Sequence, residues 1–168
     1  MKTISVEFSK AKAWYKIASD VIATTEKRPY SHAYLKYECP ITGILMVSQA
    51  SKGSVNEITY ENFLKENIVI EEIKLCLTED QILKILKKAK SKQGDPYAND
   101  QLLNIAFKKI FRHSLNKTNG EKAVICSEHV VRCLQEVDMY FARDCNIDEI
   151  TPSDLFKSLK ETNWIKLS

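Results

Sequence analysis

The chain has 168 residues, of which 44% are hydrophobic and 28% charged, a balance typical of a single soluble globular domain over residues 1–168. Its formal net charge of +3 implies no general affinity for nucleic acid or for membrane surfaces. The apolar runs are too short to span a bilayer, and the N-terminus lacks the continuous apolar core of a signal peptide. We therefore expect a cytoplasmic protein with no integral membrane segment.

The first half of the chain consists mainly of short runs in which apolar and polar residues alternate, the pattern of β-strands. Residues 9–25 interrupt it with apolar residues at helical spacing, and Pro40–Gly43 is typical of a turn. A helical turn near 60–64 is an alternative to part of the strand pattern. The predicted strands lie at residues 3–9, 31–38 and 44–50, and within 58–64 and 67–77.

The second half predicts helices. Thr78 followed by Gln81 is typical of a capping box at a helix start, and helical spacing continues to Ala89. The lysines from 84 to 92 predict a solvated basic face, because no aromatic residues are interleaved with them as in a nucleic-acid platform. Further helices are predicted at residues 99–111, from about 127 to 143, and from the cap at 151–155.

Five cysteines occur, and their odd number and scattered spacing do not fit a disulfide framework. No Cys-x-x-Cys pair is present and only three histidines occur, so the ligand spacing of a structural zinc site is missing. The pattern predicts reduced thiols in a cytosolic setting, with no metal and no cofactor. The cysteines are Cys39, Cys76, Cys126, Cys133 and Cys145.

Cys126 follows the apolar residues 123–125 and precedes a helical pattern, so we expect it at or near a helix N-terminus. Backbone N–H groups and the helix dipole at such a position favour the thiolate, which is the reactive form of cysteine. The same N–H groups can donate hydrogen bonds to an oxyanion. Cys126 is therefore a candidate nucleophile, although a buried cysteine often only fills space. Cys133 and Cys145 are interpreted as packed thiols.

A cysteine nucleophile requires an imidazole base, and the two need to meet only in space. His32 opens the predicted strand 31–38 directly after a loop, which makes it the candidate base for the proton of Cys126. Gln49 lies on the strand expected to pair with it, where its amide oxygen can accept from the imidazole N–H. Ser48 is expected to point to the opposite face. A purely structural histidine is the simpler alternative.

The histidine precedes the cysteine, whereas papain-like chains usually have the cysteine first. Five short segments are similar, in order, to motifs of the permuted papain-like cysteine amidases of the YiiX/YaeF type. These enzymes are similar to NlpC-type cell-wall endopeptidases and to lecithin:retinol acyltransferase-like enzymes. The resemblance extends over most of the chain, from about Phe8 to Leu155. Its segments are Tyr30–His32, Met46–Ala50, Gly94–Tyr97, Ile125–Glu128 and Ile150–Leu155.

The resemblance implies a thiol hydrolase that cleaves an amide through a thioester and requires no cofactor. Cys126 would be the nucleophile and His32 the base, with Gln49 orienting His32 and Tyr97 assisting at the oxyanion. A tyrosine hydroxyl can donate to an oxyanion alongside the Cys126 N–H, but a half-buried aromatic residue after a proline turn is an equal interpretation of Tyr97. The implied substrate is an acyl compound such as a peptide or isopeptide, including a cell-wall peptide, and a phage or bacterial origin stays open.

Two positions depart from the pattern of that family. His129 stands where an apolar residue is more usual, and we expect it to be a bystander on the helix rather than a rival base. Asn99-Asp100 stands where an aromatic residue is more usual, which leaves substrate specificity open. Glu128, in the first helical turn, is expected to stabilise the helix dipole while facing away from the thiolate.

Together these patterns predict an α+β domain with a small antiparallel sheet packed against helices, the cysteine helix among them, as in a circularly permuted papain-like (NlpC-like) fold. Two other functions fit the same residues. The first is an acyltransferase or lipid esterase that uses the same triad, which an apolar tunnel would favour. The second is a non-catalytic structural or binding module that retains the fold, which a sulfur far from the imidazole would favour.

Overall fold

The structure is a computed structural model. It describes residues 3–12, 29–51, 53–96, 125–138, 147 and 150–161. Within these residues the chain forms one five-stranded sheet in the order β4-β3-β2-β1-β5, and each neighbouring pair is antiparallel. The strands are β1 (Ile4–Ala11), β2 (His32–Glu38), β3 (Leu45–Ser51), β4 (Ser54–Thr59) and β5 (Asn67–Leu75).

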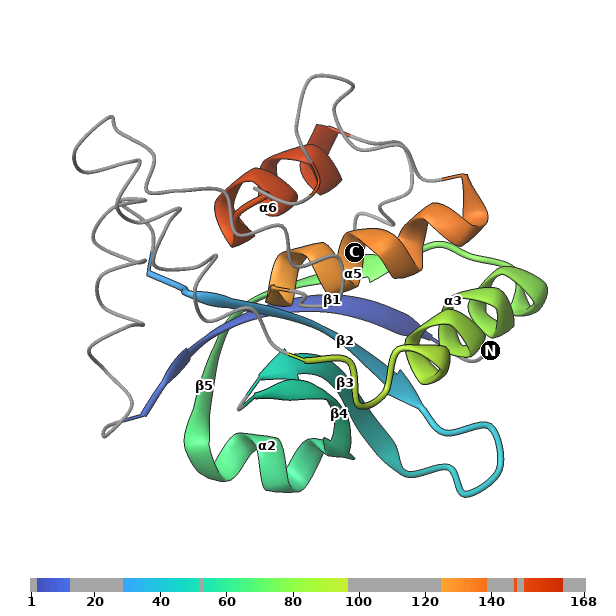
Figure 1. The fold of residues 1–168 in the computed structure, drawn as a ribbon, viewed down its shortest axis with the longest axis horizontal. Coiled ribbons are helices and arrows are strands. Elements are labelled where there is room, and N and C mark those ends of the chain that lie inside the picture. The colour runs from blue at the N-terminus through green and yellow to red at the C-terminus, as the bar shows by residue number, and fades with distance from the viewer. Residues whose placement is uncertain are drawn as a thin grey trace.

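Helices cover both sides of this sheet (Figure 1). Three of them, α3, α5 and α6, contribute to one hydrophobic core, and α2 lies on the other side of the sheet. The predicted α+β class, with an antiparallel sheet packed against helices, is confirmed. The helices are α2 (Tyr60–Glu66), α3 (Glu79–Ser91), α5 (Cys126–Leu134) followed by a 3-10 turn (Gln135–Val137), and α6 (Pro152–Glu161).

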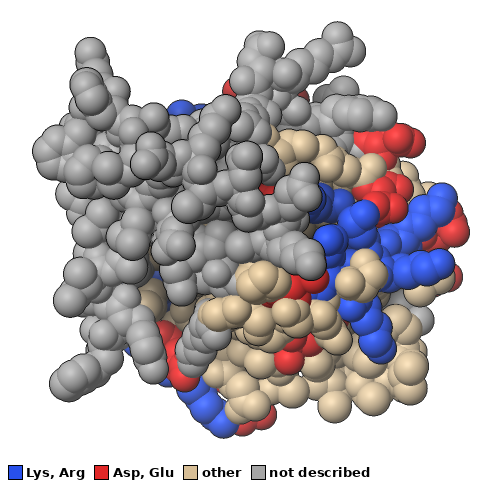
Figure 2. Space-filling view, in the orientation of Figure 1, with Lys and Arg blue, Asp and Glu red and all other residues tan. Residues whose placement is uncertain are grey.

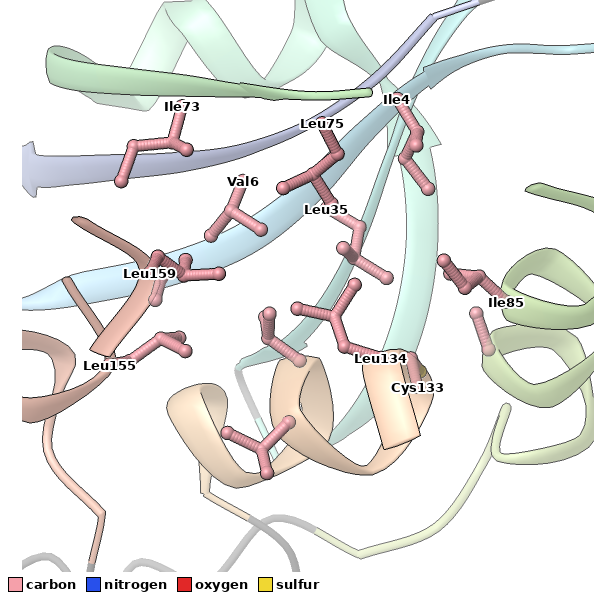
Figure 3. Close-up of a cluster of buried hydrophobic side chains, with 14 of the residues drawn as sticks. Ile4, Val6, Leu35, Ile73, Leu75, Ile85, Cys133, Leu134, Leu155 and Leu159 are labelled. Carbon is pink, nitrogen blue, oxygen red and sulfur yellow. The ribbon is translucent and has the colours of Figure 1, made fainter. Parts of the chain in front are cut away.

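The main core lies between the sheet and the helices α3, α5 and α6. Apolar residues at every second position of β1 and β2 point into it, and the apolar stripe of α5 packs onto them. Full burial of one such aliphatic side chain stabilises the fold by about 1.5–3 kcal/mol. Figure 3 shows this core, including Ile4, Val6, Leu35, Ile73, Leu75, Ile85, Cys133, Leu134, Leu155 and Leu159.

The side of the sheet that faces α2 is more polar. Tyr34 and Val47 pack there against Phe63 of α2. Glu7 on the same side is only 1% exposed, and it forms an ion pair with Lys36 and accepts a hydrogen bond from the Tyr34 hydroxyl at 2.6 Å. These partners are needed because an unpaired carboxylate inside a protein is very costly.

Two boundaries in the first half of the chain differ from the sequence-based prediction. β1 continues to Ala11, so the helix expected to begin at Ser9 does not begin there. The rest of that predicted helix lies outside the described residues. Residues 60–66 form α2, so the helical alternative for 60–64 is confirmed and the strand is not; the Thr59 side chain accepts a hydrogen bond from the Asn62 N–H at 3.3 Å and thereby caps the helix.

The cysteine helix is shorter than predicted. α5 ends at Leu134 and a 3-10 turn follows, after which Asp138 adopts a left-handed φ of 58°. Aspartate tolerates this conformation better than most residues, and the change of hand stops the helix. The predicted helix over 99–111 lies outside the described residues.

The lysines from 84 to 92 lie at or near the surface, as predicted, and three of them form ion pairs with acidic residues. At the right of the face shown in Figure 2, Lys and Arg side chains lie next to one another with Asp and Glu among them. Exposed pairs of this kind each contribute about 1 kcal/mol or less. The pairs are Lys84–Asp80 at 2.9 Å, Lys88–Glu136 at 2.7 Å and Lys92–Asp95 at 3.0 Å.

Candidate active site

The pairing of β2 with β3 brings His32 and Gln49 together. His32 is the first residue of β2, and Gln49 lies in β3, the neighbouring antiparallel strand (Figure 1). The imidazole Nε2 of His32 and the side-chain Oε1 of Gln49 are 2.8 Å apart. An amide oxygen only accepts hydrogen bonds, so Nε2 carries the proton and donates it. The predicted hydrogen bond between these side chains is therefore present.

This hydrogen bond leaves Nδ1 of a neutral His32 with its lone pair. Burial lowers the pKa of His32 below its ordinary value of 6.5, and the hydrogen bond to Gln49 partly opposes that effect. The rings of Tyr34 and Phe63 lie beside the imidazole, with centroids at 5.7 and 6.3 Å. Aromatic neighbours replace water and disfavour the imidazolium. His32 is thus neutral near pH 7, with one nitrogen able to take a proton, as a general base requires.

Cys126 is the first residue of α5, which confirms that it lies at a helix N-terminus. The preceding Ile125 is extended, with φ −86° and ψ 163°, so the chain turns directly into the helix at the cysteine. The first N–H groups of a helix have no partners within the helix. The Cys126 side chain is 2% exposed, and α5 packs against β2 and β3, the strands of His32 and Gln49.

The first turn of α5 is held by side chains on either side of the cysteine. The Ser127 hydroxyl donates to the Ile150 carbonyl oxygen, next to α6. The carboxylate of Glu128 accepts from the Ile125 N–H at 3.3 Å, and Arg132 pairs with it at 2.6 Å. Glu128 thus stabilises the helix start as expected. Contrary to the prediction, its carboxylate turns back to the residue before the cysteine, and Arg132 balances its charge.

Ser48 and Gln49 are neighbours in β3 and point to opposite sides of the sheet, as predicted. Gln49 reaches His32 near the α2 side. Ser48 is fully buried on the α5 side, where its hydroxyl lies 3.0 Å from Nε2 of His129. Two adjacent residues of β3 therefore contact different imidazoles. Gln49 contacts His32 of β2, and Ser48 contacts His129 of α5.

His129 is attached to the sheet through Ser48, a structural contact that the sequence did not predict. It is 1% exposed, and burial lowers its pKa to about 4. Asp95 opposes this effect, whereas the charges of His32 and Lys92 lower the pKa further. Because His129 is so fully enclosed, we interpret it as a structural residue and not as a rival base.

Tyr97 lies outside the described residues. The segment directly before it is attached to β4: the Val55 N–H donates to the Asp95 carbonyl at 2.8 Å, and the Gly94 N–H donates to the Val55 carbonyl at 2.9 Å. Pro96 forms an isolated bridge with Ser54. The predicted oxyanion role of Tyr97 therefore stays a prediction.

A surface pocket between α3 and α5 contains none of the predicted site residues. Its cationic side chains are each paired with a carboxylate, so it offers no unbalanced positive charge to an anion. In the part of the chain that the structure describes, no three His, Cys, Asp or Glu side chains lie together as a metal site would need. The pocket is lined by Lys88, Lys92, Arg132, Gln135 and Glu136.

One residue near the site, Asn56, and one contact, between Ser48 and His129, were not predicted from the sequence. Asn56 lies opposite Gln49 in the β3–β4 pairing and accepts from the Gln49 amide nitrogen at 3.3 Å. Asparagine is depleted in strands, so an asparagine within a strand pattern was the available signal. The contact between Ser48 and His129 had no local signal, because it joins segments 81 positions apart.

Comparison with models of known protein families finds no match, and neither does comparison with curated proteins. Among the described residues no helix is both long enough and apolar enough to cross a membrane.

Proposed function

We propose that this chain is a cysteine hydrolase of the permuted papain-like type, which cleaves an amide bond of a peptide or isopeptide. Cys126 is the nucleophile, His32 the general base and Gln49 the residue that orients His32. The backbone N–H of Cys126 and the hydroxyl of Tyr97 bind the oxyanion. A cytoplasmic location fits the thiol chemistry, because a catalytic cysteine must remain reduced.

In the proposed reaction, Nδ1 of His32 takes the proton of the Cys126 thiol, and the thiolate attacks the carbonyl carbon. The tetrahedral oxyanion collapses, the carbon–nitrogen bond breaks, and the imidazolium returns its proton to the leaving amine. Water then attacks the thioester while His32 takes one of its protons. Collapse of this second intermediate releases the carboxylic acid and restores the thiol.

The observation that carries this proposal is the hydrogen bond of 2.8 Å between His32 Nε2 and Gln49 Oε1. It leaves the other ring nitrogen available, and the helix that begins at Cys126 packs on the same two strands from the opposite side of the sheet. The proposal requires the sulfur to reach Nδ1 at the start of β2, where the sheet ends and His32 is partly exposed.

The test is alkylation by iodoacetamide, measured for each cysteine by peptide mass spectrometry from pH 5 to 9. We expect Cys126 to react near pH 6 to 7, because the thiolate is the nucleophile and an adjacent imidazole favours it. The Cys126→Ala variant should lose this modification and all hydrolysis. Peptides, simple esters and phospholipids are then compared as substrates, and preference for phospholipid would favour an acyltransferase or lipid esterase.

Three other cysteines provide internal controls. Cys133, also in α5, is buried, and burial raises its pKa to about 12. Transient opening of the helix would expose it together with Cys126. Cys39 is a surface control, because hydrogen bonding with Thr42 lowers the pKa of its thiol. Equal alkylation of Cys39, Cys76 and Cys126 in the folded protein would overturn the proposal.

The near-complete burial of Cys126, 2% exposed, favours one second candidate. This is a binding module that retains the arrangement without using it for catalysis. Such a module would leave Cys126 as unreactive as Cys133 at every pH tested, while binding of a peptide ligand would be unaffected by Cys126→Ala.

A further inference from the structure

The proton position on His32 depends on which end of the Gln49 amide faces it. The oxygen end accepts and places the proton on Nε2. The nitrogen end would donate, so Nε2 would become the acceptor and Nδ1 would carry the proton. Rotation of the amide by half a turn exchanges the two ends with little change in shape. His32 is a suitable base only with the first arrangement, so another contact must select it.

Asn56 makes that contact. Gln49 and Asn56 are directly opposite each other in the β3–β4 pairing, and the Gln49 Nε2 donates to the Asn56 Oδ1 at 3.3 Å. Asn56 is itself oriented by the turn between these strands. Its Nδ2 donates to the carbonyl oxygens of Ser51 at 3.0 Å and Ser54 at 3.2 Å.

The direction of this chain of hydrogen bonds is set at its far end. Backbone carbonyl oxygens only accept, so the Asn56 nitrogen must face them and its oxygen must face Gln49. The Gln49 nitrogen must then face Asn56, and its oxygen must face His32. Each step follows from the previous one, so two fixed carbonyls in the β3–β4 turn determine the position of a proton on β2.

We infer that Asn56 is a positioning residue that holds His32 in its Nε2-protonated form by orienting the Gln49 amide. The catalytic meaning of this inference rests on the proposed function, but the effect on the histidine does not. Asn56 touches neither the imidazole nor the reacting atoms. It acts through Gln49. Its loss therefore changes the position of the proton on His32 more readily than it changes the fold.

The direct test is nuclear magnetic resonance of the protein labelled with ¹⁵N in its histidines. Ring nitrogens with and without a proton have well separated ¹⁵N shifts, and the His32 signals are identified from their loss in His32→Gln. We expect a protonated Nε2 and an unprotonated Nδ1 in the wild type. In Asn56→Ala, both His32 nitrogens should move toward intermediate shifts as the two tautomers mix.

Asn62→Ala is the matched control, because Asn62 is an exposed asparagine of α2 whose amide oxygen accepts from Lys65 at 2.8 Å. It should leave the His32 shifts unchanged. If Asn56→Ala does not fold, Asn56→Val replaces it, since valine favours a strand and has no hydrogen-bonding side chain to orient Gln49. Wild-type shifts at His32 in a folded Asn56 variant would overturn the inference.

A second readout links the inference to the reaction. Loss of an orienting residue in a catalytic triad can cost several powers of ten in rate. For a residue one contact further away, we expect alkylation of Cys126 at pH 7 to fall about tenfold in Asn56→Ala, with the pH profile shifted upward. If the tautomer changes but Cys126 is unreactive even in the wild type, the inference stands and the proposed function fails.

Discussion

Within the described part of the chain, two histidines contact adjacent residues of β3, and their surroundings differ. His32 is partly exposed at the start of β2 and bonds to an amide oxygen that can only accept. His129 is 1% exposed in the middle of α5 and bonds to the Ser48 hydroxyl, which can donate or accept. The first contact therefore defines the position of a proton, whereas the second mainly joins a helix to a sheet. The chemical role of a buried histidine depends on its partner and its access to water.

The largest difference between the two histidines should be seen in the chemistry of Cys126. We expect His32→Ala to slow alkylation of Cys126 at pH 7 and any hydrolysis by about 100-fold or more, the usual contribution of a general base. His129→Gln, which retains a hydrogen-bonding side chain for Ser48, should leave the alkylation rate close to that of the wild type. Rates are measured on protein shown to be folded by circular dichroism. A loss of equal size in His129→Gln would make His129 the base.

The next difference concerns the free energy of unfolding, to which His129 should contribute more than His32. His129→Ala should lower the free energy of unfolding by about 3 kcal/mol, because it leaves a cavity and a buried Ser48 hydroxyl without its partner. His32→Ala should cost about 1 kcal/mol, because its site is open to water on one side. Urea unfolding followed by circular dichroism measures both values. Equal losses would mean that the two sites are equally enclosed.

Acid should weaken the attachment of α5 to the sheet through His129. The folded pKa of His129 is about 4, lowered first by burial, against about 6.5 in the unfolded chain. The unfolded chain therefore binds more protons, so this contribution is complete above pH 6.5 and is lost as the pH falls toward 4. The loss amounts to about 3 kcal/mol, and His32, whose pKa is also lowered, adds to it in the same direction. Urea unfolding at pH 7, 5.5 and 4.5 measures it.

His129→Gln serves as the control for this pH dependence, because glutamine does not titrate. Its stability should decline less between pH 7 and 4.5 than that of the wild type. Parallel decline in both proteins would assign the acid sensitivity to other groups.

The smallest expected effect comes from a helix cap outside both histidine sites. Thr78 accepts from the Gln81 N–H at 3.3 Å and its own N–H donates to the Gln81 side chain at 3.0 Å, which completes the predicted capping box of α3. Thr78→Ala should cost about 1 kcal/mol of stability. It should leave Cys126 alkylation and the His32 ¹⁵N shifts unaltered. Any change in those readouts would show that they report general stability.

Much of the sheet was predictable because strand alternation and turn residues are local signals. The alternation in β1 and β2, the turn at Pro40–Gly43 and the cap at Thr78 all act within a few residues. The end of α5 was not predictable in this way. Helical spacing continues past Leu134, and only the left-handed Asp138 shows where the helix stops.

The candidate site was predictable only in part. His32 and Gln49 could be paired because their strands follow one another along the chain, and Cys126 could be placed at a helix start. The roles of Asn56 and His129 depend on strand register and on where α5 packs. Both are set by tertiary structure and leave almost no trace in local sequence.

All five strands lie between Ile4 and Leu75, whereas the helix that covers their apolar side begins at Cys126. A ribosome adding about 5–20 residues per second synthesises the intervening segment in about 3–10 seconds. During this interval the nascent sheet has no α5 over its apolar side, so it is a natural target for a chaperone and a point of risk for aggregation. The same order of synthesis means that the thiol enters the molecule after the imidazole and its amide partners have had time to assemble.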